Sequence, residues 1–157
     1  MYTALLPTRL LPPLIAADHP LLGRRFAATG YADATLADLV GRLRAAGDPL
    51  AIVLFGSWAR GEGRPESDLD FLVIVPEPRR TGAVWDRLIQ ALLDAPLRCD
   101  VLIASPTTLA AVAGVPGFAE QEALRDGICL YRRPRRHAAA IPLLSQRKEG
   151  DGLAEGT

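Results

Sequence analysis

Short apolar runs alternate with amphipathic segments through the middle of the chain, and this alternation constrains the fold more than any other feature. Residues 50–55, for example, read LAIVLF, which is typical of a buried strand. The segment before it, residues 34–46, places Leu36, Leu39 and Leu43 on one helical face. The predicted strands are 50–55, 68–75, 97–104 and 128–131, and the predicted helices are 34–46, 81–95, 107–113 and 118–126. The pattern predicts an α/β (α+β) domain in which helices flank a small mixed sheet.

The charge distribution divides the chain into three parts. Residues 33–131 contain 14 acidic and nine basic side chains, whereas residues 1–32 and 132–157 are both net basic. We expect the central part to be the folded domain. The first part is expected to be an arm or an extra helix, and the last part a basic, disordered tail. The total charge is zero, which argues against nucleic acid as a direct partner, while the acidic centre favours a cation.

Composition and cysteine use indicate the compartment. No apolar run approaches the ~18 residues of a membrane span, and the apolar start lacks the basic region of a signal peptide. Cys99 and Cys129 lie among apolar neighbours and are expected to be buried thiols rather than a disulfide. We therefore predict a cytoplasmic protein with no membrane partner.

A glycine and a serine follow the first predicted strand. Gly56 allows close approach of a ligand to the backbone, and Ser57 offers a hydroxyl where a short helical turn over residues 57–60 begins. Free N–H groups at such a point suit an anion such as a triphosphate. Taken alone, Gly-Ser after a strand is usually only a turn.

Two aspartates lie at the head of the second predicted strand. Asp68 and Asp70 are two residues apart, so both carboxylates face the same side of the strand. Two neighbouring anions repel each other unless a cation lies between them, and Mg²⁺ prefers such oxygen ligands. The alternative is a pair of exposed aspartates at a strand end.

A third aspartate, Asp100, lies within the apolar run 97–104. If that strand lies beside residues 68–75, Asp100 completes a cluster of three carboxylates able to hold two cations, which suits in-line displacement at phosphorus. The alternative is a surface residue on an edge strand.

Together these residues match a family motif. Gly56-Ser57, ten residues, and then Asp68-Leu69-Asp70 resemble the Gly-Ser-x10-Asp-x-Asp pattern of the minimal nucleotidyltransferases in the DNA polymerase β-like superfamily. Asp100 stands where the third metal carboxylate of that family falls. The resemblance covers residues 34–131 and implies the polymerase β-like nucleotidyltransferase fold.

The resemblance implies an enzyme that moves a nucleoside monophosphate from an NTP, expected to be ATP, onto a hydroxyl group. Gly56 and Ser57 would hold the β- and γ-phosphates. Asp68 and Asp70 would bind the metal ions, two Mg²⁺ or alternatively Mn²⁺. Asp100 would bind the second metal and assist removal of the acceptor proton. Trp58 would either pack beneath the loop or border the nucleotide pocket.

The sequence constrains the acceptor of the nucleotide less than it constrains the reaction. Only 26 residues follow Tyr131, which we expect to be too few for an acceptor-binding domain. A stand-alone domain of this kind resembles the antitoxin of HEPN–MNT toxin–antitoxin pairs, which adds AMP to a tyrosine of a helical HEPN ribonuclease toxin. Residues 132–136 and the N-terminal arm are then candidate docking segments. Two alternatives stay open: transfer to a small molecule or an RNA end, with a homodimer completing the site, and a non-catalytic partner-binding module.

Overall fold

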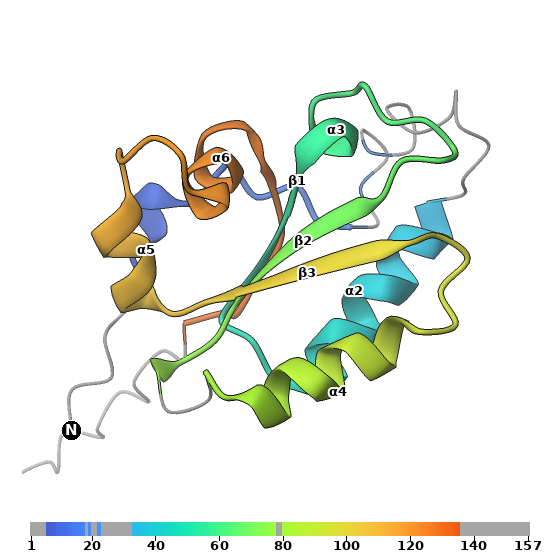
Figure 1. Cartoon of the computed structure of the whole chain (residues 1–157), viewed down its shortest axis with the longest axis horizontal. Helices are drawn as coiled ribbons and strands as arrows, with labels where there is room; N and C mark the ends of the chain where they lie inside the picture. Colours follow the sequence, from blue (N-terminus) through green and yellow to red (C-terminus); the bar gives the residue numbers. More distant parts are fainter. Residues whose placement is uncertain (1–5, 18, 20–21, 23–32, 78–79, 136–157) are drawn as a thin grey trace, which may run out of the picture.

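A computed structural model describes residues 6–17, 19, 22, 33–77 and 80–135 of the chain (Figure 1). The elements are η1 (Thr8–Leu10), α2 (Asp33–Gly47), β1 (Ala51–Phe55), α3 (Gly56–Ala59), β2 (Leu69–Ile74), α4 (Gly82–Leu92), β3 (Cys99–Ala104), α5 (Pro106–Val112), α6 (Ala119–Asp126) and β4 (Ile128–Arg132).

Four strands form one mixed sheet in the order β3-β2-β1-β4. Strand β1 is antiparallel to both β2 and β4, whereas β2 and β3 are parallel. The parallel pair is joined by a crossover that contains α4, as parallel strands require. Strand β3 is therefore an edge strand, and its residues pair with one neighbour only.

Helices cover both faces of this sheet (Figure 1). Alternation along β2 explains why: Phe71 and Val73 belong to the core cluster beneath α2 and α4, whereas Leu72 and Ile74 belong to the cluster beneath α5 and α6. All four of these side chains are fully buried. Thr81 and Ser105 explain where two of the helices begin, since their hydroxyls accept from the N–H groups of Val84 in α4 and Thr108 in α5.

The predicted α/β architecture and the order of its elements are confirmed. Helix α4 ends at Leu92 rather than at Ala95, because the chain turns before Pro96, which disfavours helical backbone at the residue preceding it. Strand β4 continues one residue beyond the predicted end, since Arg132 pairs with Ala51 of β1. The described helices include none long and apolar enough to cross a bilayer.

The N-terminal arm contacts the edge of β4. Leu14 forms an isolated parallel bridge with Cys129, and the Ile15 N–H donates to the Cys129 carbonyl at 2.8 Å. Ala17 and Leu22 are buried in the core cluster on the α2 side. The described part of the arm thus docks on the domain, while residues 136–157 of the predicted tail lie outside the described residues.

Candidate active site

The strand register brings two of the three predicted carboxylates together. Asp70 lies in β2 directly opposite Asp100 of the parallel strand β3, and on its other side it pairs with Phe55 at the end of β1. Asp68 immediately precedes β2, two residues before Asp70 and therefore on the same side. Asp100 is exposed on the edge strand, whereas Asp68 and Asp70 are partly buried. Asp100 is thus a surface residue on an edge strand, as the alternative expectation stated, and this edge position places it beside Asp70.

Gly56 forms the floor next to Asp70. The chain leaves β1 with a positive φ of 73° at Gly56, a backbone conformation that favours glycine. A Cβ atom at this position would overlap the Asp70 carboxylate oxygen Oδ2. The glycine is therefore required twice, by its backbone conformation and by the close approach of the carboxylate.

Ser57 lies in the short helix α3 that follows at once. The first N–H groups of a helical turn have no partner within the turn, and those of Gly56 and Ser57 lie directly after the end of β1. Ser57 is half-buried, and in the described part of the chain its hydroxyl forms no hydrogen bond. These groups can donate to an anion placed above the strand end.

An arginine that the sequence analysis did not single out neutralises Asp68. Arg98 Nε lies 3.1 Å from Asp68 Oδ1, and Arg98 Nη2 donates to Oδ2 at 3.2 Å. The Arg98 side chain is 84% exposed, whereas that of Asp68 is 25% exposed. The ion pair is therefore open to solvent on the arginine side, and small rotations of Arg98 would release the carboxylate.

Asp70 forms no such ion pair with any residue that the structure describes, and its ionisation is suppressed. The pKa of Asp70 is raised to about 6, first by burial and then by repulsion from the Asp100, Asp68 and Glu122 carboxylates, while Arg60 opposes the shift. The same cluster acts on the neighbouring thiol: burial, and then Asp100, Asp68 and Asp70, raises the pKa of Cys99 to about 11. Both pKa shifts include repulsion from the aspartates, so the three carboxylates are close enough to interact electrostatically.

The donor set fits a divalent cation. Oxygen ligands that repel one another are what a hard cation such as Mg²⁺ relieves. Within the described ranges, however, no three acidic, histidine or cysteine side chains already converge as a metal site. Asp68 is in the ion pair with Arg98. Asp70 and Asp100, with Asp68 once released, are the residues that would hold a metal.

The loop between α3 and β2 is fastened at two points. Trp58 is 2% exposed, and its indole Nε1 donates to the Ser67 carbonyl at 3.1 Å. Arg60 forms an ion pair with Glu122 of α6 at 2.7 Å. The expectation that Trp58 packs beneath the loop is thus confirmed, and α6 is linked to the site.

Comparison with known families identifies the domain. A family model described as a nucleotidyltransferase domain matches residues 36–125. The chain belongs to this family. The match spans the nucleotidyltransferase core from α2 to α6 and includes the predicted site residues, Gly56, Ser57, Asp68, Asp70 and Asp100. The N-terminal arm and β4 lie outside it, and no curated protein matches the chain.

Two contributors to this nucleotidyltransferase site were missed from the sequence. Arg98 could have been found, because Arg98 and Asp100 have the same spacing as Asp68 and Asp70, so a parallel register sets one pair opposite the other. Glu122 gave no such signal. Its approach to Arg60 depends on how α6 packs beside α3, which local pattern does not determine.

Proposed function

We propose that Asp68, Asp70 and Asp100 form the site at which this nucleotidyltransferase transfers AMP from ATP to an acceptor hydroxyl group: the acceptor oxygen bonds to the α-phosphorus, the bond to the β-phosphate breaks, and pyrophosphate leaves. The supporting observation is the placement of Asp70 opposite Asp100 with Gly56 packed against Asp70. That placement gathers negative side chains beside the backbone turn best suited to receive phosphates.

Each residue has a distinct role in this proposal. The backbone at Gly56 and the hydroxyl of Ser57 donate to the β- and γ-phosphates. Asp100, exposed on the edge strand, accepts the proton of the incoming hydroxyl. Asp70 and Asp68 face the α-phosphate side of the site. In this proposal two bound ions, Mg²⁺ or Mn²⁺, would neutralise negative charge at the reacting phosphate.

We propose further that the acceptor is a tyrosine of a partner protein, a helical HEPN ribonuclease toxin, and that the chain acts as its antitoxin. The motif resemblance supports this, and so does the exposure of Asp100 at the edge of the sheet. A tyrosine on another protein can approach an edge strand more readily than the covered interior of a sheet. A toxin silenced in this way would carry the added nucleotide at that tyrosine.

The test is to co-express the chain with the protein encoded by the adjacent gene and to measure the intact mass of the co-purified partner. The expected result is a mass increment of one or more nucleoside monophosphates, lost after tyrosine-to-phenylalanine substitution in the partner. Asp100→Asn should abolish the increment without changing the melting temperature. Asp86→Asn, an exposed carboxylate on α4, is the matched control and should leave the increment unchanged.

Other outcomes separate the alternatives. Labelling of an RNA end or a small hydroxylated molecule, with no labelled protein, would replace the antitoxin proposal with a different transferase. Full neutralisation of the partner by Asp68→Ala/Asp70→Ala would instead show that binding alone silences it. Normal turnover by Asp100→Asn in the presence of Mg²⁺ would remove Asp100 from the reaction.

A further inference from the structure

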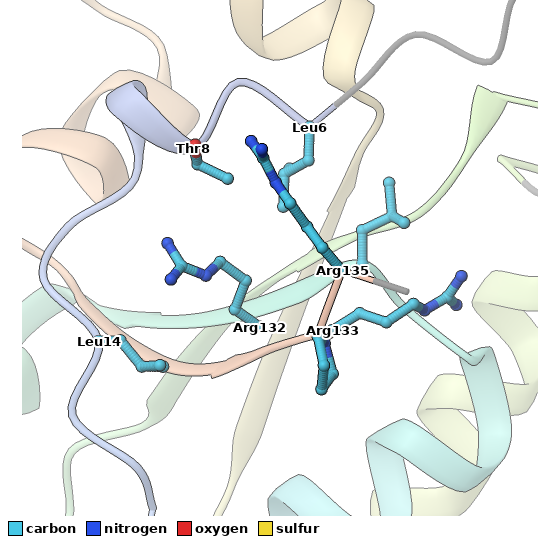
Figure 2. A pocket seen from close by; sticks show the side chains of 8 residues that line it. Leu6, Thr8, Leu14, Arg132, Arg133 and Arg135 are labelled. Atoms are coloured by element: carbon cyan, nitrogen blue, oxygen red, sulfur yellow. The ribbon is translucent and has the colours of Figure 1, made fainter. Parts of the chain in front are cut away.

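A hollow lies at the other end of the sheet from the carboxylates. It has a volume of about 540 Å³ and lies between the N-terminal arm and the chain that leaves β4 (Figure 2). Its lining combines aliphatic and basic side chains, chiefly Leu6, Leu14, Leu50, Arg132, Arg133 and Arg135. The hollow is within the size range of pockets that receive ligands.

Backbone hydrogen bonds fix the segments that form this hollow. The arm is tied to β4 by the bridge between Leu14 and Cys129. On the other side, the Arg133 N–H donates to the Leu50 carbonyl at 2.8 Å, which continues the sheet past the end of β4. The lining is therefore part of the folded domain.

The arginines differ in what they contact. Asp48 neutralises Arg133, since Asp48 Oδ1 lies 2.8 Å from Arg133 Nη2. Arg133 also donates to the backbone carbonyl of Asp48. Arg132 and Arg135 pair with no carboxylate in the part of the chain that the structure describes. Figure 2 shows both guanidinium groups beside the aliphatic side chains. Two positive charges that no described carboxylate neutralises thus border an apolar surface.

Strand geometry separates this hollow from the transferase site. Arg132 is opposite Ala51 at the start of β1, whereas Asp70 is opposite Phe55 at its end. At ~3.3 Å per residue, the two ends are roughly 13 Å apart along the strand. The lining also lies almost entirely outside residues 36–125, the part shared with the nucleotidyltransferase family, with Leu50 as the exception.

We infer that this hollow is a docking site for an acidic, aliphatic segment of a partner protein. Its carboxylates would pair with Arg132 and Arg135, and its aliphatic side chains would cover Leu6, Leu14 and Leu50. Leu14 is 48% exposed and would lose that exposure on binding. A nucleic-acid strand fits less well, because this lining offers no aromatic surface for bases to stack on.

Fluorescence anisotropy tests the inference on the full chain, without nucleotide or metal, so that its outcome does not depend on the proposed transfer. The probe is a fluorescein-labelled peptide, Gly-Glu-Leu-Asp-Leu-Glu-Gly. We expect saturable binding that Arg132→Gln/Arg135→Gln weakens at least about tenfold. The matched control, Arg80→Gln/Arg87→Gln, removes two arginines outside the hollow and should change affinity by less than about twofold.

Probe variants test each half of the recognition. Replacing both leucines of the peptide with serine, or Leu14 of the chain with serine, should weaken binding several-fold, and circular dichroism checks that the variant folds. Absence of saturable binding, equal affinity for the serine peptide, or tighter binding of a ten-nucleotide single-stranded RNA would each overturn the inference. An equal loss in the control double variant would show only a general attraction to positive charge.

Discussion

Arg98 forms a bidentate ion pair with Asp68, while two residues further along both strands Asp70 lies opposite Asp100. The parallel register of β2 and β3 therefore places an attractive pair next to a repulsive one. Arg98 supplies the positive charge for one carboxylate, and the other two have no comparable partner in the described site. A cation that binds here competes with Arg98 for Asp68.

Arg98→Ala is predicted to tighten binding of Mn²⁺ by about threefold to tenfold, because it removes a competing positive charge beside the carboxylates. The Arg98 side chain is 84% exposed, so the melting temperature should hardly change. Isothermal titration calorimetry with Mn²⁺ measures the effect. Arg87→Ala, on α4, is the control. Weaker Mn²⁺ binding by Arg98→Ala would mean that the arginine instead orients Asp68 for the metal.

Gly56→Ala is predicted to abolish transfer and to destabilise the fold, because its Cβ would displace the Asp70 carboxylate. The chain supplies a matched control in Gly61, which has a similar positive φ of 77° but open space around its Cβ position. Both variants carry the backbone penalty of about 1–2 kcal/mol. Only Gly56→Ala should lose activity in a transfer assay. Comparable losses in both would assign the effect to backbone strain alone.

Asp70 is predicted to make stability depend on pH. Its pKa in the folded protein is about 6, above its ordinary value of 3.8, so the folded state holds the proton more tightly than the unfolded state does. Stability is then lost as pH rises through this window. Because the group is only partly buried, Asp70→Asn should raise the free energy of unfolding at pH 7.5 by about 1–2 kcal/mol in EDTA.

Urea unfolding at several pH values measures this gain, which should shrink as pH is lowered from 7 toward 4. Excess Mn²⁺ should reverse the order of the two proteins, since the metal stabilises only the form that binds it. Asp86→Asn serves as the control and should show no pH-dependent difference. A gain that stays constant from pH 7.5 to 4 would falsify the assignment of the raised pKa to Asp70.

Ser57→Ala is predicted to raise the KM for the nucleotide severalfold while leaving Mn²⁺ affinity unchanged, because in the proposed function the hydroxyl donates to the phosphates and is not a metal ligand. Steady-state kinetics and calorimetry measure the two quantities separately. Ser105→Ala is no suitable control, since that hydroxyl caps α5. The control is Thr107→Ala, at an exposed position on α5. An unchanged KM in Ser57→Ala would exclude the hydroxyl from phosphate binding.

Local pattern was sufficient to predict the elements and to mark the candidate site residues. The runs that end at Phe55 and follow Asp70 are short, continuously apolar and bounded by turn residues, which is typical of buried strands. The antiparallel register of Phe55 with Asp70 then places Gly56 and Asp70 at one end of the sheet. The arrangement of strands was harder. That Asp100 lies on an edge strand, exposed yet beside Asp70, depends on the sheet order, and residue periodicity does not encode strand neighbours.

The hollow between the arm and β4 illustrates the same limit. Leu6 and Arg135 are far apart in the sequence and belong to segments without a clear period, yet they line one surface. Their meeting follows from the bridge between Leu14 and Cys129, which is a tertiary pairing with no local signature. Sequence marked both segments as candidates for docking, but the structure was needed to bring them together.

Trp58→Phe is predicted to loosen the loop between α3 and β2. The substitution keeps most of the ring volume but removes the hydrogen bond from Nε1 to the Ser67 carbonyl, which should lower the free energy of unfolding by about 1 kcal/mol in urea unfolding.

Gly63 lies against the indole ring of Trp58, and a Cβ there would come within 2.5 Å of it, so Gly63→Ala should destabilise the loop by pushing on the indole. In a Trp85→Phe background Trp58 is the sole tryptophan, since the chain contains two. Gly63→Ala should then shift its emission to longer wavelength as the buried indole gains solvent, whereas Gly82→Ala, with open space around its Cβ, should not. Emission unchanged in Gly63→Ala would show that the loop yields without moving the indole.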